Sequence, residues 1–169
     1  MTAILDRQNI EGYLDIQLPF NMTDEEFFLF CQINGDLKLE RDSKGNILII
    51  SPSGLRTGNF NSKVGAKLEI WNDTYQLGIT GDSNTGFYLP NGAMRAPDAS
   101  WTSNERLSQF TEEELEKFPY VCPEFVIEIL SPSDSLKKTN AKMVEYIENG
   151  ALLGWLLDRK KKTSFYLSS

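Results

Sequence analysis

The chain has 169 residues, 40% of them hydrophobic and 24% charged, a composition that suits one folded domain and argues against long disordered stretches. It contains no histidine, which excludes Ser-His-Asp and Cys-His catalysis and nearly every zinc site, so its chemistry must come from carboxylates, lysines, hydroxyls or a bound metal. The net charge of −7 counts against nonspecific coating of nucleic acid, but it is compatible with an enzyme that gathers its basic groups in one cleft.

The first half of the chain predicts a short helix, a hairpin and a long helix. Thr23 and Glu26 have the spacing of a capping box, which indicates a helix start. Turn-forming residues at 42–46 separate an alternating stretch from an apolar one, which predicts a β-hairpin over 34–50. From 57 to 73 apolar residues recur at helical spacing, which predicts a helix packed against a sheet. These apolar residues are Phe60, Val64, Leu68 and Trp71.

The second half predicts strands around one further long helix. The expected strands are 86–90 and 94–101, joined by a hairpin turn at Asn91-Gly92, followed by 124–130, 154–158 and 163–167. The expected helices are a short acidic one over 111–117 and a longer one that the run 131–134 caps and Gly150 ends. This order of elements predicts an α/β fold in which a mixed sheet has helices on both faces.

Two acidic residues lie in strand-like segments, although burial of an unpaired carboxylate is costly. Glu128 lies in the most hydrophobic segment, where alternation places it on one face with Val126 and Leu130. Asp98 follows Pro97, which interrupts strand pairing. Each acid alone has a simpler explanation. Glu128 could lie on a solvent-exposed strand face, and Asp98 could belong to a turn. On neighbouring strands the two acids together predict a site for Mg²⁺ or Mn²⁺, which use oxygen ligands.

Several segments carry a resemblance to a known family. They are RAPDASW at 95–101, PEFVIE at 123–128, SPSDSL at 131–136, the helix from Lys142 to Gly150, GWLLD at 154–158, and the upstream Gly58-Asn59 and Asn61. The arrangement resembles the PD-(D/E)XK nuclease superfamily, and more closely a large family of restriction-endonuclease-like proteins abundant in cyanobacteria. The match runs from residue 15 onward. It implies one domain over 1–169 with a restriction-endonuclease-like mixed central sheet flanked by helices.

The resemblance implies that Asp98 and Glu128 are catalytic metal ligands. The superfamily also places a lysine two residues after the second acid, where this chain has Leu130. The family resemblance implies that this lysine has moved to the following helix, with Lys142 as the main candidate. Lys137 and Lys138 are rivals, and the alternative for Lys142 is a solvated lysine paired with Glu145 or Glu148. In this reading Lys138, Lys142 and Tyr146 form one helix stripe, while Leu136, Met143 and Ile147 face the sheet.

The superfamily often places a polar or acidic residue of the long helix near the metal, which makes Asn61 and Glu69 auxiliary candidates beside Lys138. Family members usually continue past the strand at 163–167, so this chain is a short member, a fragment or a truncated version that lacks a C-terminal segment. Cys31 and Cys122 belong to no metal-ligand spacing, and reduced thiols are expected rather than a disulfide.

These features predict a Mg²⁺- or Mn²⁺-dependent endonuclease that hydrolyses DNA as a homodimer, since cutting both strands of a duplex suits two-fold symmetry. The alternative is a catalytically inactive nuclease-fold protein that serves as a nucleic-acid-binding or dimerisation module. A small β-rich ligand-binding domain is a third reading, which the paired acids disfavour. A cytoplasmic location is expected, because the first residues lack a secretory pattern and the apolar stretch at 151–157 is too short to cross a bilayer.

Overall fold

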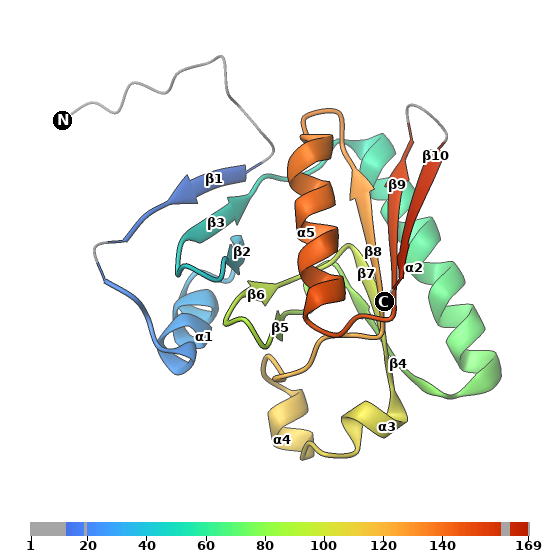
Figure 1. The fold of residues 1–169 in the computed structure, drawn as a ribbon, viewed down its shortest axis with the longest axis horizontal. Helices are drawn as coiled ribbons and strands as arrows, with labels where there is room; N and C mark the ends of the chain where they lie inside the picture. The colour runs from blue at the N-terminus through green and yellow to red at the C-terminus, as the bar shows by residue number, and fades with distance from the viewer. Residues whose placement is uncertain (1–12, 19, 160–162, 169) are drawn as a thin grey trace.

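The computed structural model describes residues 13–18, 20–159 and 163–168, which form two five-stranded sheets with helices around them (Figure 1). All paired strands of the first sheet are antiparallel. Its strands are β1 (Tyr13–Ile16), β3 (Ile47–Ile50), β2 (Lys38–Arg41), β6 (Met94–Arg95) and β5 (Phe87–Tyr88), in that spatial order. The expected hairpin over 34–50 is confirmed as the β2–β3 pair.

The second sheet is mixed, because β8 and β9 run parallel while the other neighbours are antiparallel. Its strands, in spatial order, are β10 (Thr163–Ser168), β9 (Leu153–Asp158), β8 (Phe125–Leu130), β7 (Ala99–Ser103) and β4 (Gly78–Asp82). A mixed central sheet was expected, and this part of the prediction is confirmed. The separate first sheet and strand β4 were not foreseen.

The two long helices cover opposite faces of the second sheet, as the sequence predicted. In Figure 1, α5 lies on one side of β8 and β9, and α2 lies on the other side. Contacts of α2 with β4 and β7, and of α5 with β8, β9 and β10, agree with this arrangement. The helices are α1 (Asp24–Ile33), α2 (Leu55–Tyr75), α3 (Asn104–Leu107), α4 (Glu112–Leu115) and α5 (Leu136–Glu148).

Strand β8 is buried on both faces, and its alternation decides what each face contacts. Ile127 and Ile129 pack with Leu68 of α2 in one core cluster. Val126 and Leu130 pack with buried side chains of α5 in another, which leaves Glu128 on the α5 face. The predicted division of this strand into two faces is confirmed.

Some helix details differ from the expectation. The capping box of Thr23 and Glu26 is confirmed at the start of α1, but the N-cap of α5 is Ser135, and the side chain of Asp134 instead accepts a bond from the backbone N–H of Ser131. Leu136, expected to face the sheet, is 39% exposed. Tyr146, expected beside the lysines, is fully buried.

The expected strand over 94–101 is wrong in one respect, because residues 96–98 interrupt it. Before the interruption, β6 pairs in the first sheet, and after it β7 pairs in the second. Pro97 has no N–H to donate to a neighbouring strand, and the N–H of Ala96 donates to the Glu40 carboxylate at 3.1 Å. The chain therefore passes from one sheet to the other just before Asp98. The Asn91-Gly92 turn joins β5 to β6 as predicted, with Gly92 at a φ of 85°.

Both cysteines are free, as expected, with Cys122 buried and Cys31 partly buried. Within the described ranges, we find no helix that combines the length and the apolar character needed to cross a membrane.

Gly78, at the start of β4, offers a test of the sheet packing. A Cβ at this position would lie 2.2 Å from the carbonyl oxygen of Thr102 and 2.8 Å from the Trp101 ring, so that backbone would have to move. We expect Gly78→Ala to lower the free energy of unfolding by about 2–3 kcal/mol, measured by urea denaturation. The control is Gly65→Ala within α2, where a Cβ meets nothing within 4 Å. It should raise stability by about 0.5–1 kcal/mol, and equal effects of the two variants would contradict the described packing.

Candidate functional site

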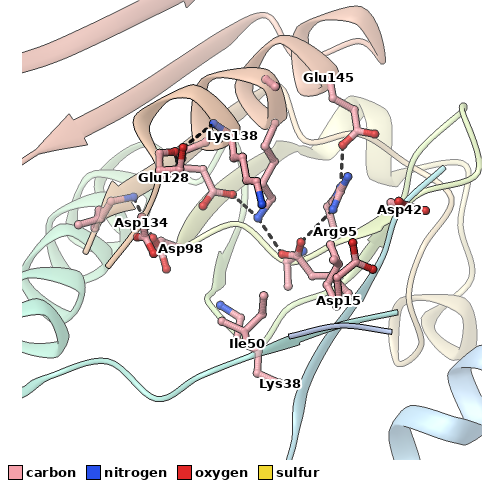
Figure 2. A pocket seen from close by; sticks show the side chains of 18 of the residues that line it. Asp15, Lys38, Asp42, Ile50, Arg95, Asp98, Glu128, Asp134, Lys138 and Glu145 are labelled. Carbon is pink, nitrogen blue, oxygen red and sulfur yellow. Dashed lines mark hydrogen bonds and ion pairs between the residues drawn. The ribbon is translucent and has the colours of Figure 1, made fainter. Parts of the chain in front are cut away.

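A cavity of about 660 Å³ lies between the first sheet, β8 and α5 (Figure 2). Its lining carries seven carboxylates, from Asp15, Glu40, Asp42, Asp98, Glu128, Asp134 and Glu145. It carries five cationic side chains, from Lys38, Lys44, Arg95, Lys138 and Lys142. The excess of acids over bases gives the cavity a character that favours a cationic ligand.

Asp98 and Glu128 are brought together by the pairing of β7 with β8. The antiparallel register ends with Ala99 opposite Ile127, so Asp98, just before β7, and Glu128 of β8 lie at the same end of this strand pair. Both acids line the cavity and are seen close together in Figure 2. Two carboxylates thirty positions apart in the sequence thus meet at one edge of a single sheet, as predicted. Their role as metal ligands stays a prediction.

The Asp98 carboxylate is held on both of its oxygens. Its Oδ2 accepts a hydrogen bond from the backbone N–H of Ile129 at 2.8 Å, and its Oδ1 accepts one from the Asn61 amide at 3.2 Å. Asn61, an expected auxiliary residue, therefore reaches the site from α2. Burial raises the pKa of Asp98, and the N–H of Ile129 and the lysines Lys38 and Lys142 oppose this effect.

Lys142 reaches the site from α5 and contacts two carboxylates. Its Nζ lies 2.7 Å from Glu128 Oε1 and 2.7 Å from Glu40 Oε1. The Tyr146 hydroxyl, one helical turn later, donates to the same Glu128 oxygen at 3.1 Å. Glu145, which the alternative reading paired with Lys142, instead binds Arg95 at 2.7 Å. The structure thus places Lys142 beside Glu128 rather than in solvent.

Glu40 is a residue of this site that the sequence reasoning missed. It lies on β2 and is 2% exposed. Besides Lys142, its carboxylate binds Arg95 at 3.2 Å and the backbone N–H of Ala96 at 3.1 Å. The only available signal was an acidic residue next to Leu39 in an alternating strand, a pattern that solvated strand faces share. The local sequence does not indicate that Lys142 of α5 reaches this residue.

Burial and neighbouring charges shift the pKa values of these groups in different directions. Burial raises the pKa of Glu128 to about 7, with Asp98 and Glu40 adding to the effect and Lys142 opposing it. Burial also acts to raise the pKa of Glu40, but Lys142 and Arg95 outweigh it and the net shift is downward. Burial acts to lower the pKa of Lys142, but the two carboxylates prevail and raise it. Glu40 and Lys142 thus form a charged pair at neutral pH. Glu128, with a pKa of about 7, is only partly ionised at that pH.

Comparison with known proteins gives the family. Residues 24–168 match the family model Uma2, described as "Putative restriction endonuclease". The chain belongs to the Uma2 family. No curated protein matches it.

The Uma2 chain also resembles a solved structure, the crystal structure of a "putative nuclease belonging to DUF820" from Anabaena variabilis ATCC 29413. The two share 21% sequence identity, and the match covers 77% of this chain and 71% of that one with a TM-score of 0.67. At this identity the likeness shows the fold. The predicted restriction-endonuclease-like α/β fold is therefore confirmed, as is the family resemblance.

The remaining expected residues of this Uma2 protein fall into two groups. Lys138 lines the cavity one helical turn before Lys142. Glu69 does not belong to the site, because it faces β4, where its carboxylate accepts a hydrogen bond from the Thr80 hydroxyl. Leu130, at the usual lysine position, is 8% exposed and packs in the core cluster beneath α5.

The side chains of this site suit Mg²⁺ or Mn²⁺, which need few protein ligands. They do not suit a metal that is bound entirely by protein side chains. Among the residues that the structure describes, no three acidic, histidine or cysteine side chains are arranged to hold one ion. Asp98 and Glu128 supply two carboxylates, and Mg²⁺ commonly uses one or two carboxylates together with water and substrate phosphate. The two acids also line the same cavity, and the Asp98 charge raises the pKa of Glu128, a repulsion that a cation would offset.

The raised pKa of Glu128 predicts a pH-dependent stability in the absence of divalent ions. The unfolded chain releases this proton near the ordinary pKa of 4.5, whereas the folded protein keeps it up to about pH 7. The contribution of Glu128 is therefore fully present below pH 4.5 and is lost as the pH rises through about 7. Glu128→Gln removes this titration, so urea unfolding in EDTA should show the variant gaining stability relative to wild type between pH 5 and pH 7. A difference independent of pH would contradict the shift.

Proposed function

We propose that this Uma2 protein is a Mg²⁺- or Mn²⁺-dependent endonuclease that hydrolyses phosphodiester bonds in DNA. The observation that carries the proposal is the meeting of Asp98 and Glu128 at one edge of the second sheet, with the Lys142 ammonium 2.7 Å from Glu128. Two carboxylates with an adjacent lysine suit phosphodiester hydrolysis without histidine. The family description, restriction endonuclease, supports DNA as the substrate.

Each residue has a defined part in the proposed mechanism. Asp98 and Glu128 would hold the ion, which when bound activates water and neutralises charge that develops on the phosphodiester. Asn61 and the backbone of Ile129 fix the Asp98 carboxylate, so it needs no reorganisation when it binds a cation. The Lys142 ammonium adds a fixed positive charge, which stabilises the negative charge of the pentavalent transition state.

The surroundings of the acids suit a substrate that extends beyond one nucleotide. A second cavity, of about 570 Å³, adjoins the first and shares Asp98, Ile129 and Lys38 with it. Asp98 thus lies where two hollows meet. The exposed lysines Lys44 and Lys138 line the first cavity, where cationic side chains can contact backbone phosphates.

We extend the proposal to a homodimer that acts in the cytoplasm. Two copies related by a two-fold axis present two equivalent sites to the two antiparallel strands of a duplex. Light scattering coupled to gel filtration measures the mass directly, and a 19.2 kDa particle at assay concentration would contradict the dimer.

Incubation of the purified protein with supercoiled plasmid tests the function. We expect conversion to open-circular and linear DNA with Mg²⁺ or Mn²⁺, and none in EDTA. A dimer that cuts both strands in one encounter would form linear DNA while supercoiled plasmid remains. Cleavage that continues in EDTA would overturn the metal-dependent proposal.

One observation favours a second candidate, an inactive nuclease-fold module that binds nucleic acid. Leu130 occupies the usual lysine position and is buried in the core. If Lys142 does not replace that lysine in function, the chain retains the fold and the acids without activity. Fluorescence anisotropy with labelled duplex DNA distinguishes the candidates, since binding without cleavage in Mg²⁺ or Mn²⁺ identifies the module.

A further inference from the structure

We propose that Glu40 is a positioning residue that fixes both the Lys142 ammonium and the segment that carries Asp98. Glu40 lies on the first sheet, whereas Glu128 and Lys142 belong to the second sheet and its helix, and Asp98 lies in the segment between the two sheets. One carboxylate of the first sheet thus connects to two parts of the site. The catalytic consequence of this inference rests on the proposed nuclease function, but the positioning itself is measurable without activity.

The first line of support is that the Glu40 carboxylate has no freedom to turn. Its Oε2 pairs with the Arg95 guanidinium at 3.2 Å, and its Oε1 accepts from the Ala96 N–H and from Lys142. Arg95 is in turn held by Glu145 at 2.7 Å. Because Glu40 is 2% exposed, water does not compete for these bonds.

The second line of support is the position of Lys142 between two carboxylates. Its Nζ contacts Glu128 and Glu40 at the same distance, 2.7 Å. In the proposed mechanism Glu128 would hold a cation, and its carboxylate would then interact less strongly with the Lys142 ammonium. Glu40 then keeps Lys142 in place, because its own partners do not change. A lysine side chain has four rotatable bonds, so an ammonium with one partner fewer would spread over several positions.

The third line of support is the bond from Glu40 to the backbone at Ala96. This residue lies two positions before Asp98, with the buried Pro97 between them, in the segment where the chain passes between the sheets. The Ala96 N–H has no strand partner there and uses Glu40 instead. Loss of the Glu40 carboxylate would therefore loosen the approach to Asp98 as well as the Lys142 side chain.

A matched control exists at the other end of β8. Glu124 is also buried, at 8% exposure, pairs with an arginine (Arg106, 3.0 Å) and accepts a backbone N–H (Ser103, 3.1 Å). It does not line the cavity. Glu124→Gln therefore reproduces the general effect of neutralising a buried, ion-paired glutamate, and it leaves the Lys142 contacts intact.

The first measurement is the rate at which acetic anhydride acetylates Lys142, followed by peptide mass spectrometry and normalised to the exposed Lys117 of the same sample. We expect Glu40→Gln to raise the relative rate about tenfold, as loss of one charge-assisted hydrogen bond implies. Glu124→Gln should leave it unchanged. Glu40→Asp keeps the charge, so its relative acetylation rate of Lys142 should lie between the rates of wild type and Glu40→Gln. If Glu40→Gln does not fold, the rate of Glu40→Asp tests the proposal. An unchanged Lys142 rate in folded Glu40 variants would overturn the proposal.

The second measurement is a double-mutant cycle on plasmid cleavage. Glu40→Gln should lower kcat about 10- to 30-fold with KM within about threefold, because it displaces a transition-state contact. In the Lys142→Met background the same change should have a smaller effect, and the part that remains measures the contribution through Ala96 and Asp98. Equal effects in both backgrounds would overturn positioning through Lys142. If wild type cleaves nothing while the acetylation rates change as expected, the nuclease proposal fails and the positioning of Lys142 by Glu40 stands.

Discussion

Asp98→Asn is expected to reduce Mg²⁺-dependent plasmid cleavage by about 1000-fold or more, since loss of one of two charged ligands removes several kcal/mol of transition-state stabilisation. The substitution keeps the shape of the side chain. However, the two groups that contact Asp98, the N–H of Ile129 and the amide of Asn61, are both donors. An asparagine has one acceptor oxygen, so it satisfies only one of them without rearrangement.

Calorimetry with Mn²⁺ provides the matching binding measurement. We expect wild type to bind Mn²⁺, and Asp98→Asn and Glu128→Gln to lose this binding while their circular dichroism spectra match that of wild type. Glu124→Gln serves as the control for a buried carboxylate outside the cavity. If wild type and Asp98→Asn cleave plasmid at the same rate, the proposed active site is wrong.

Lys142→Met is expected to have the second largest effect, a loss of about 100-fold in kcat, because it removes a preorganised positive charge beside Glu128. It should also lower the free energy of unfolding by about 2 kcal/mol, less than the full cost of a buried unpaired charge. The cost is reduced because Glu40 keeps Arg95 as a partner and Glu128 can take up a proton.

The pH dependence of this stability loss checks its cause. Without the ammonium, ionised Glu128 has lost its positive partner, so the loss should grow as the pH rises from 6 to 8 in urea denaturation. Lys117→Met, which removes an exposed ion pair with Glu113 on the surface, should change neither stability nor kcat measurably. Full activity of Lys142→Met would contradict the role of Lys142 and make Lys138, which lines the same cavity, the next candidate for the positive charge.

Local rules predicted those parts of the fold whose causes lie within a few residues. The capping box at Thr23, the Asn91-Gly92 turn and the two faces of β8 each depend on short-range geometry, and each is confirmed. The meeting of Asp98 with Glu128 needed more than local rules. It followed from the family motif, which ties two strands together although thirty residues separate the acids.

Parts of the structure that depend on distant neighbours were not predictable in this way. Glu40 has the local pattern of a solvated strand residue, and only its contacts with Arg95 and with Lys142 of α5 show that it is a buried, paired carboxylate. Pro97 indicated an interruption, but nothing nearby in the sequence indicates that the next strand joins another sheet. Glu69 was expected near Asp98, but it contacts Thr80 of β4. Asn61, two turns earlier on α2, reaches Asp98 instead. Polar residues occur along much of α2, so the sequence did not indicate which of them lies at the level of Asp98.

The passage of the chain between the two sheets at Ala96 to Asp98 has a consequence for biosynthesis. The ribosome releases the N-terminal strands and Glu40 first, then Asp98, and finally Glu128 and Lys142. The cavity lining is therefore complete only after α5 has been synthesised, because α5 supplies Lys138, Lys142 and Glu145. For the proposed nuclease, this order of synthesis means that no chain lacking α5 contains all the residues of the proposed active site.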